Sequence, residues 1–208
     1  MISVRHLFDL TGRTALITGG SRGLGLQIAE ALGEMGCRVL ETARKADETG
    51  EAVAPLRPNG IQAQGCAADV QFPEAISSLV DFALGELGHI DVLVNNAGAT
   101  WGAATQDHPL DAWDKVMNLN VRSVFLLCQQ VGKRTMIPRR SGRILNVASI
   151  TRLKGDPPGA QATPPYKTSK AALINLSRAL ASEWGEHGIP VNAPAPGMCS
   201  TSPSVASR

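Results

Sequence analysis

The sequence lacks the features that mark several specialised classes of protein. Its four cysteines are far apart and form no CxxC pair, which is typical of buried or surface thiols in a reducing compartment. Its four histidines show no metal-ligand spacing, so we expect no metal site. No apolar run could span a bilayer, and the amino terminus has no cleavage signal. These absences predict a cytoplasmic protein that binds no membrane.

The charge pattern argues against a nucleic-acid partner. The net charge is +2, and acidic and basic residues are interspersed without a basic stripe. With 208 residues the chain is most simply one domain, large enough to bury roughly 70% of its unfolded surface. We find no repeat and no interdomain linker. We therefore expect one domain over residues 1–197, followed by an irregular Pro- and Ser-rich tail at 198–208.

Strand-length apolar runs alternate with longer helical patterns along the chain. Strands are predicted at residues 14–18, 38–42, 61–67, 91–95, 143–147 and 189–192. Helices are predicted at 24–35, from about 43 to 56, at 73–87, at 110–136 (stopping before Pro138) and at 166–187. This alternation predicts a doubly wound parallel sheet, a Rossmann fold in three α/β/α layers, with ligands at the carboxyl ends of the strands.

A glycine-rich turn joins the first predicted strand to the first helix. Gly19, Gly23 and Gly25 give a GxxxGxG spacing rather than GxGxxG. Such a turn lets backbone N–H groups approach a pyrophosphate at the amino end of a helix. An ordinary tight turn is the alternative, but the position between strand and helix favours a dinucleotide site.

The end of the second strand indicates which dinucleotide the site prefers. NAD sites usually carry a carboxylate there, and NADP sites an arginine. Ala43 supplies no carboxylate, whereas Arg44 and Arg22 could flank a 2′-phosphate or could simply be solvated. Glu41 complicates this interpretation, since it lies two residues earlier on the same face of the strand. We predict a preference for NADP(H), with NAD(H) possible.

Tyr166 is the only tyrosine, and it precedes Lys170 by four residues. On a helix this spacing places both side chains on one face, where an ammonium can stabilise a phenolate. Tyr166 could instead be a packed aromatic residue. Beside a nucleotide cradle, the pair indicates hydride transfer with the tyrosine as general acid and base.

Three further segments stand at strand ends or beside the predicted site: Asn95-Asn96-Ala97-Gly98, Asn118-Leu119-Asn120-Val121 and Asn146-Val147-Ala148-Ser149. Together with the glycine turn and the Tyr166/Lys170 pair, they resemble the motifs of the short-chain dehydrogenase/reductase family. The resemblance covers about residues 8–197. It implies hydride transfer between a nicotinamide and a carbonyl or secondary alcohol carbon. The motif context is similar to 3-oxoacyl-thioester reductases and gluconate 5-dehydrogenase-like members, without choosing between them.

The resemblance implies a role for each matching residue. Tyr166 would be the general acid and base, Ser149 would polarise the carbonyl oxygen, Lys170 would lower the tyrosine pKa and hold the nicotinamide ribose, and Asn120 would bind a relay water. Asn120 could instead be a bridging amide, Ser149 a turn residue and Asp69 a helix N-cap. With Arg44, the predicted cofactor contacts are Gly19, Ser21, Arg22, Gly23, Leu24, Asp69, Val70, Asn96, Ala97, Gly98, Tyr166, Lys170, Pro196 and Gly197.

The sequence gives less information about the substrate entrance and the oligomeric state. Residues 150–165 would form the rim of the substrate entrance. Trp101 would be either a platform for the substrate or a packing residue. Arg152 and Lys154 would either contact an anionic substrate or be solvated. Family members continue beyond Pro196-Gly197 with a substrate lid and a last strand, so we expect a shortened member whose activity is weak or lost, or a dinucleotide-binding remnant. The two long helices, 110–136 and 166–187, would join two copies, and we expect a dimer.

Overall fold

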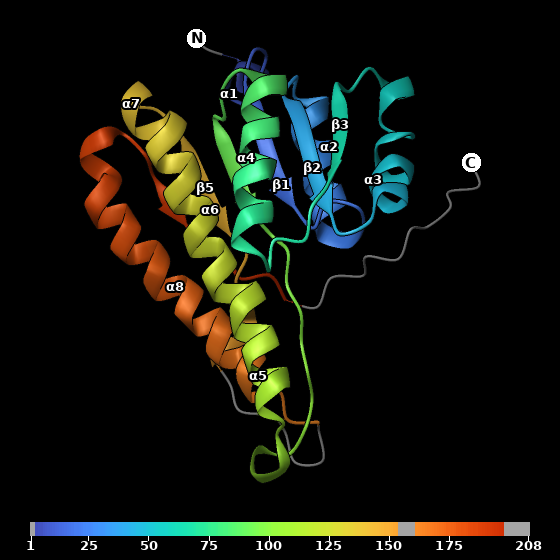
Figure 1. Cartoon of the computed structure of the whole chain (residues 1–208). Helices are drawn as coiled ribbons and strands as arrows, with labels where there is room; N and C mark the ends of the chain where they lie inside the picture. Colours follow the sequence, from blue (N-terminus) through green and yellow to red (C-terminus); the bar gives the residue numbers. More distant parts are fainter. Residues whose placement is uncertain (1–2, 154–160, 198–208) are drawn as a thin grey trace.

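Six parallel strands form one sheet in the computed structural model, which describes residues 3–153 and 161–197. Their order is β3-β2-β1-β4-β5-β6, so the chain winds outward in one direction and then in the other from β1 and β4 (Figure 1). The strands are β1 Thr14–Thr18, β2 Arg38–Ala43, β3 Ala63–Ala67, β4 Val92–Asn95, β5 Arg143–Asn146 and β6 Val191–Asn192. The doubly wound fold predicted from the sequence is confirmed.

Helices cover both faces of the sheet, because the central strands are apolar on both sides. The helices are α1 Val4–Leu7, α2 Gly23–Glu34, α3 Ala46–Val53, α4 Pro73–Leu87, α5 Leu110–Met117, α6 Ser123–Val131, α7 Ile137–Arg139 and α8 Pro164–Trp184. One core, around Leu16, Leu93 and Ile144, packs against α4, α6 and α8. The second, around Ala15, Ile17 and Val39, packs against α2 and α3. No helix in the described part of the chain is long and apolar enough to cross a membrane.

The long helix predicted at 110–136 departs from a regular α-helix. π-helical turns at Asn118–Arg122 and Gly132–Met136 separate α5, α6 and α7. The predicted stop before Pro138 is wrong, because α7 runs through it and ends at Arg139, followed by the C-cap Arg140, whose φ is 50°. Proline is tolerated here because it occupies the first turn of a new α-helical segment, where its missing N–H breaks no regular bond.

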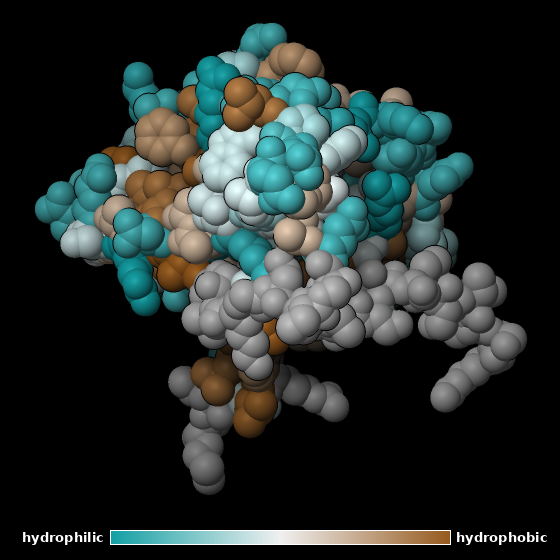
Figure 2. All heavy atoms as spheres, turned by 90° about the horizontal axis from the view of Figure 1, so that it is seen from below, coloured by the Kyte–Doolittle hydropathy of each residue, from teal (hydrophilic) through white to brown (hydrophobic). Residues whose placement is uncertain are grey.

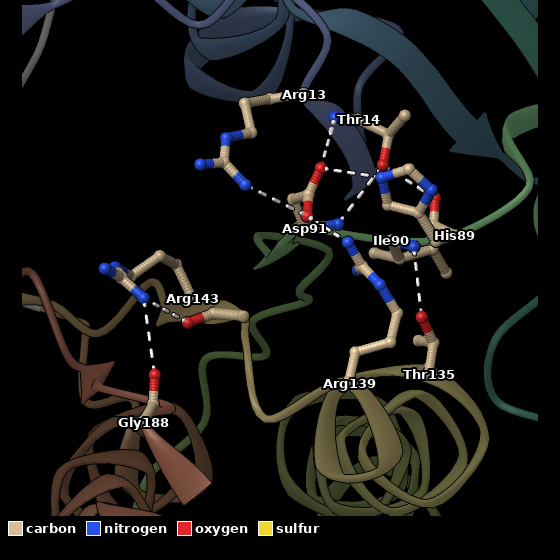
Figure 3. Close-up of polar contacts among 10 residues, drawn as sticks. Arg13, Thr14, His89, Ile90, Asp91, Thr135, Arg139, Arg143 and Gly188 are labelled. Atoms are coloured by element: carbon tan, nitrogen blue, oxygen red, sulfur yellow. Dashed lines mark hydrogen bonds and ion pairs between the residues drawn. The ribbon is translucent and has the colours of Figure 1, made fainter.

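Buried Asp91 ties the amino ends of the strands together, at the edge away from the predicted site. Its carboxylate accepts a hydrogen bond from the Thr14 amide at 3.1 Å and from Arg139 at 3.1 Å, and it lies 3.0 Å from His89 Nε2 (Figure 3). Arg13 adds an ion pair at 3.6 Å. This cluster connects the amino ends of β1 and β4 to α7.

Candidate active site

The site lies at the carboxyl ends of the strands, between β1 and β4. From these two strands the sheet extends in opposite directions, toward β3 and toward β6. Ligands of doubly wound sheets bind at such a point. A cavity of about 270 Å³ occupies it. Nine predicted cofactor residues line this cavity: Gly19, Ser21, Arg22, Arg44, Asp69, Val70, Asn96, Ala97 and Gly98. The structure thus brings together segments that follow β1, β2, β3 and β4.

The glycine turn is held closely against the end of β4. Gly19 has a φ of 64°, and a Cβ on it would lie 2.9 Å from the Ala97 Cα. A Cβ on Gly25 would lie 2.1 Å from the Gly19 carbonyl oxygen. The Asn96 side chain donates to the carbonyl oxygens of Thr18 and Gly19, at 3.1 and 3.0 Å. Only glycine allows this approach. Gly23 and Leu24, in the first turn of α2, follow the turn but do not line the cavity.

Two exposed arginines border the cavity next to Ala43. Arg22 precedes α2, and Arg44 follows β2. Neither forms an ion pair with any residue in the ranges that the structure covers, whereas the neighbouring Glu48 pairs with Lys45 at 3.5 Å. The two guanidinium groups therefore remain available to an anion at this end.

Asp69 forms part of the cavity wall after β3. Its Oδ1 accepts a hydrogen bond from the Gln71 amide at 3.1 Å. The N-cap of α4 is Phe72, which makes no side-chain capping bond. Asp69 is therefore not the N-cap of α4. It shapes the turn that carries Val70 and Gln71 along the cavity.

Helix α8 carries the Tyr166/Lys170 pair, as predicted, although it begins at Pro164 rather than at Tyr166. The Lys170 ammonium lies 5.7 Å from the centroid of the half-buried Tyr166 ring. Lys170 is buried, and its Nζ donates to the Val147 carbonyl oxygen at 2.6 Å. Burial lowers the pKa of Lys170 to about 8. It is therefore mostly an ammonium at pH 7.

Asn120 connects the π-helical turn to α8. Its Oδ1 accepts from the Ala99 amide at 2.8 Å, and its Nδ2 donates to the Ala99 carbonyl and to Ser169 Oγ, both at 2.9 Å. Ser169 Oγ in turn donates to the Tyr166 carbonyl at 2.7 Å. The side chain of Asn120 is thus a bridging amide, which the sequence left as an alternative. A Cβ on Gly98 would lie 3.3 Å from Asn120 Oδ1 and 3.7 Å from Lys170 Nζ, so both groups border Gly98.

Ser149 follows β5 and is 8% exposed. Its Oγ accepts hydrogen bonds from the Thr151 amide at 3.2 Å and from Thr151 Oγ1 at 2.9 Å. It is therefore a turn residue as well as a candidate polarising group. The adjacent Ile150 amide donates to the Pro196 carbonyl at 3.1 Å, which places Pro196-Gly197 beside the serine segment.

Two loops form a wall beyond the catalytic helix. The Ala103 amide donates to the Ala162 carbonyl, and Gln161 Nε2 donates to the Gly102 carbonyl, both at 3.0 Å. The adjacent Trp101 is 47% exposed, which leaves its ring free to contact a ligand. Lys154, the side chain of Arg152 and the tail at 198–208 lie outside the described residues.

Sequence reasoning missed several residues of the cavity: Thr42, Glu48, Ala68, Gln71, Ala99, Lys115 and Leu119. Most are immediate neighbours of predicted residues, so the strand-end rule could have found them. Leu119 directly precedes Asn120, and Lys115 lies four residues before Leu119, a helical spacing that could also have been used. Within residues 3–153 and 161–197, no group of three or more potential metal ligands occurs.

Comparisons with known proteins agree with this geometry. Residues 13–208 match the model of the family described as short chain dehydrogenase. The chain is 44% identical over 195 residues to the rhamnolipids biosynthesis 3-oxoacyl-[acyl-carrier-protein] reductase of Pseudomonas aeruginosa, covering 91% of this chain and 74% of that protein. It is 36% identical over 195 residues to the gluconate 5-dehydrogenase of Gluconobacter oxydans, covering 94% and 74%. A crystal structure of an actinorhodin polyketide ketoreductase variant with NADPH superposes with a TM-score of 0.86 at 37% identity, covering 91% and 72%.

Proposed function

Because this chain belongs to the short-chain dehydrogenase family, we propose that it is an NADP(H)-dependent oxidoreductase acting on a carbonyl or secondary alcohol carbon. The observation that carries this proposal is the Tyr166/Lys170 pair, with 5.7 Å between ammonium and ring centroid. Lys170 borders Gly98, which lines a cavity together with eight others of the fifteen predicted dinucleotide contacts, and this supports the proposal. The other six, which include Tyr166 and Lys170 themselves, do not line it.

The residues of the cavity fit a dinucleotide. The close approach of Gly19 to Ala97 and of Gly25 to Gly19 keeps side chains out of the space where a pyrophosphate would meet backbone N–H groups. Asp69 and Val70 would hold the adenine end, and Asn96, Ala97 and Gly98 would lie along the ribose. Tyr166, Lys170, Pro196 and Gly197 would border the nicotinamide end.

The charge at the adenosine end supports NADP(H) over NAD(H). Ala43 offers no carboxylate to a ribose hydroxyl, and Arg22 and Arg44 border the same cavity without ion-pair partners among the described residues. The similar actinorhodin ketoreductase variant was crystallised with NADPH. An NAD(H)-linked enzyme resembling gluconate 5-dehydrogenase is the alternative, and the ratio of kcat/KM for NADPH and NADH distinguishes the two.

The bound nicotinamide would supply the hydride, and the chain would supply protons and orientation. In the reductive direction, Tyr166 would give its phenolic proton to the substrate oxygen while Ser149 Oγ donates a hydrogen bond to that oxygen. The Lys170 ammonium would stabilise the resulting phenolate by charge. Asn120 would keep α8 in register with the loop at Ala99 through its bonds to Ala99 and Ser169.

The substrate would be a small carbonyl or alcohol compound: a 3-oxoacyl thioester, a ketone or a sugar acid. The first and last of these classes are those on which the similar 3-oxoacyl-[acyl-carrier-protein] reductase and gluconate 5-dehydrogenase act. The test is a panel of 3-oxoacyl thioesters, diketones and gluconate, with NADPH or NADP⁺ followed by absorbance. Turnover of one class identifies it. Cofactor binding without turnover of any substrate would indicate a dinucleotide-binding protein without catalysis and would overturn the proposal.

A further inference from the structure

Glu41 is a buried carboxyl group that the proposed mechanism does not use. It is 1% exposed, in β2 between Ile17 of β1 and Gly65 of β3. Both of its carboxyl oxygens lack a hydrogen-bond partner among the described residues. Buried polar groups are nearly always paired, so one that is unpaired requires a functional or structural explanation.

The side chain lies directly against the glycine turn. An added Cβ on Gly20 would lie 2.5 Å from Glu41 Cβ and 2.8 Å from its Oε2. The amides of Gly19 and Gly20 both donate to the carbonyl oxygen of Thr42, the residue after Glu41, at 2.8 and 3.2 Å. The turn therefore rests on Glu41 and is bonded to its neighbour, so a displacement of this part of β2 is transmitted to the turn.

The same strand leads directly into the cofactor cavity. Thr42, Ala43 and Arg44 follow Glu41 and all line the cavity. A change in the charge of Glu41 would thus act at the phosphate turn and at the arginine proposed to hold the 2′-phosphate. Both are anion-binding elements, which a buried negative charge disfavours.

Few ionisable groups on the packed elements can offset such a charge. Strand β1 contains none, and β3 contributes Cys66, whose pKa is raised by burial and further by the charge of Glu41. Burial raises the pKa of Glu41 itself to about 8. The remaining charged residues of the turn and of the two helices on this face are half-buried or exposed: Arg22, Glu30, Glu34, Asp47, Glu48 and Glu51.

We propose that Glu41 is a positioning residue of the dinucleotide site. Its uncharged carboxyl group supports the turn at residues 19–21, and its ionisation displaces that turn and weakens dinucleotide binding. The inference rests on the proposed function, since it requires that the cavity bind NADP(H). According to this inference, ionisation of Glu41 at alkaline pH reduces the fraction of protein that has bound cofactor.

The test compares NADPH affinity at pH 6.5 and pH 9.0 in three proteins, by tryptophan fluorescence or calorimetry. If only the neutral form binds, a pKa of about 8 makes the wild-type protein bind about tenfold more weakly at pH 9.0. Glu41→Gln cannot ionise and should lose this tenfold effect, keeping only the contribution of Lys170, which every variant shares. Glu51→Gln, which changes an exposed carboxylate of α3, should keep it.

Glu41→Met provides a second variant without an ionisable group, in case the buried amide of Glu41→Gln impairs folding. The inference is overturned if the wild type and both Glu41 variants show the same ratio of affinities at the two pH values. It is overturned together with the proposed function if the wild type binds neither NADPH nor NADH at pH 6.5. Binding at pH 6.5 with a pH effect confined to proteins that retain Glu41 supports both.

Discussion

At the scale of single residues, Tyr166 is the phenol that we propose protonates the substrate oxygen. We expect Tyr166→Phe to reduce kcat by about 10²- to 10⁴-fold, the usual contribution of a positioned acid or base. Cofactor affinity should change little, because only the hydroxyl is removed. Steady-state kinetics and a separate NADPH titration measure the two effects. Activity close to that of the wild type would show that another group transfers the proton.

Lys170 gives a prediction for the dependence of kcat on pH. Its pKa is lowered to about 8 by burial, so the ammonium that stabilises the phenolate is lost above that pH. In the reductive direction kcat should fall as pH rises through about 8, measured at saturating NADPH so that weaker cofactor binding does not contribute. The measurement is best made with Glu41→Gln, where Lys170 remains the buried group that titrates in this range. A flat profile between pH 7 and 9.5 would contradict the assignment.

The same lysine has an opposite effect on stability. Its pKa in the folded protein lies below the ordinary value of 10.5, so the unfolded state binds more protons between about pH 8 and 10.5. The free energy of unfolding should therefore gain from this group as pH rises through that window. Burying the ammonium costs stability throughout the range below pH 8.

Arg44 should determine the preference between the two dinucleotides. A charge-assisted contact to a 2′-phosphate contributes about 1.5–3 kcal/mol, so Arg44→Ala should lower kcat/KM for NADPH about 10- to 100-fold. The value for NADH should change much less, because NADH has no 2′-phosphate. Kinetics with both coenzymes make the comparison. Equal losses with NADPH and NADH would show that Arg44 contributes to the fold rather than to recognition.

At the scale of helices and strands, the Asp91 cluster is the contact that joins β1, β4 and α7. Burial raises the pKa of Asp91, but hydrogen bonds from Arg139 and Thr14 and the charges of His89 and Arg139 outweigh it and lower the pKa below 3.8. This contribution to stability is present above the ordinary pKa and is lost as pH falls through the lowered one.

We therefore expect Asp91→Asn to lower the free energy of unfolding by about 1.5–3 kcal/mol at pH 7, since it removes the buried charge that binds the partly exposed Arg13 and Arg139. Denaturant titration at pH 7 and pH 3 measures the effect, which should shrink at the lower pH. Asp81→Asn is the control, because the Asp81–Arg134 pair is on the surface and should contribute at most about 1 kcal/mol. Equal effects of the two substitutions would contradict the role of Asp91.

How far the sequence predicts these elements depends on the kind of interaction involved. Strand and helix positions follow local periodicity, and the helix Pro73–Leu87 was predicted to the residue. The π-helical turn at Asn118–Arg122 could not be predicted, because it depends on bonds from Asn120 to Ala99 and Ser169, which are distant in sequence. The unpaired state of Glu41 likewise depends on how closely Gly20 approaches it, which no local pattern encodes.

At the scale of the whole molecule, we propose a homodimer formed through the two long helices. Figure 2 shows hydrophobic atoms on the left of the view, the side on which α6 and α8 lie in Figure 1. Phe125 of α6 is 45% exposed. It borders a cavity of about 260 Å³ that Leu180 and Trp184 of α8 also line. The lining also includes the polar residues Gln129, Lys133 and Glu183. An exposed aromatic side chain with polar neighbours suits the centre of a two-fold contact with a second copy.

The dimer can be tested by light scattering. The wild-type protein should have twice the mass of one chain, and Phe125→Asp should have the mass of one chain, because it would bury an unpaired charge at the contact. Phe8→Asp changes an equally apolar but differently placed residue, 61% exposed, and should leave the mass unchanged. A wild-type protein that has the mass of a single chain would contradict the proposal.

The Asp91 cluster and the nucleotide cavity occupy opposite rims of one sheet. Substitutions that far apart, with no shared neighbours, generally have additive effects. Substitutions at the rim that contains Arg13, Asp91 and Arg139 could therefore raise resistance to heat or acid without changing kcat.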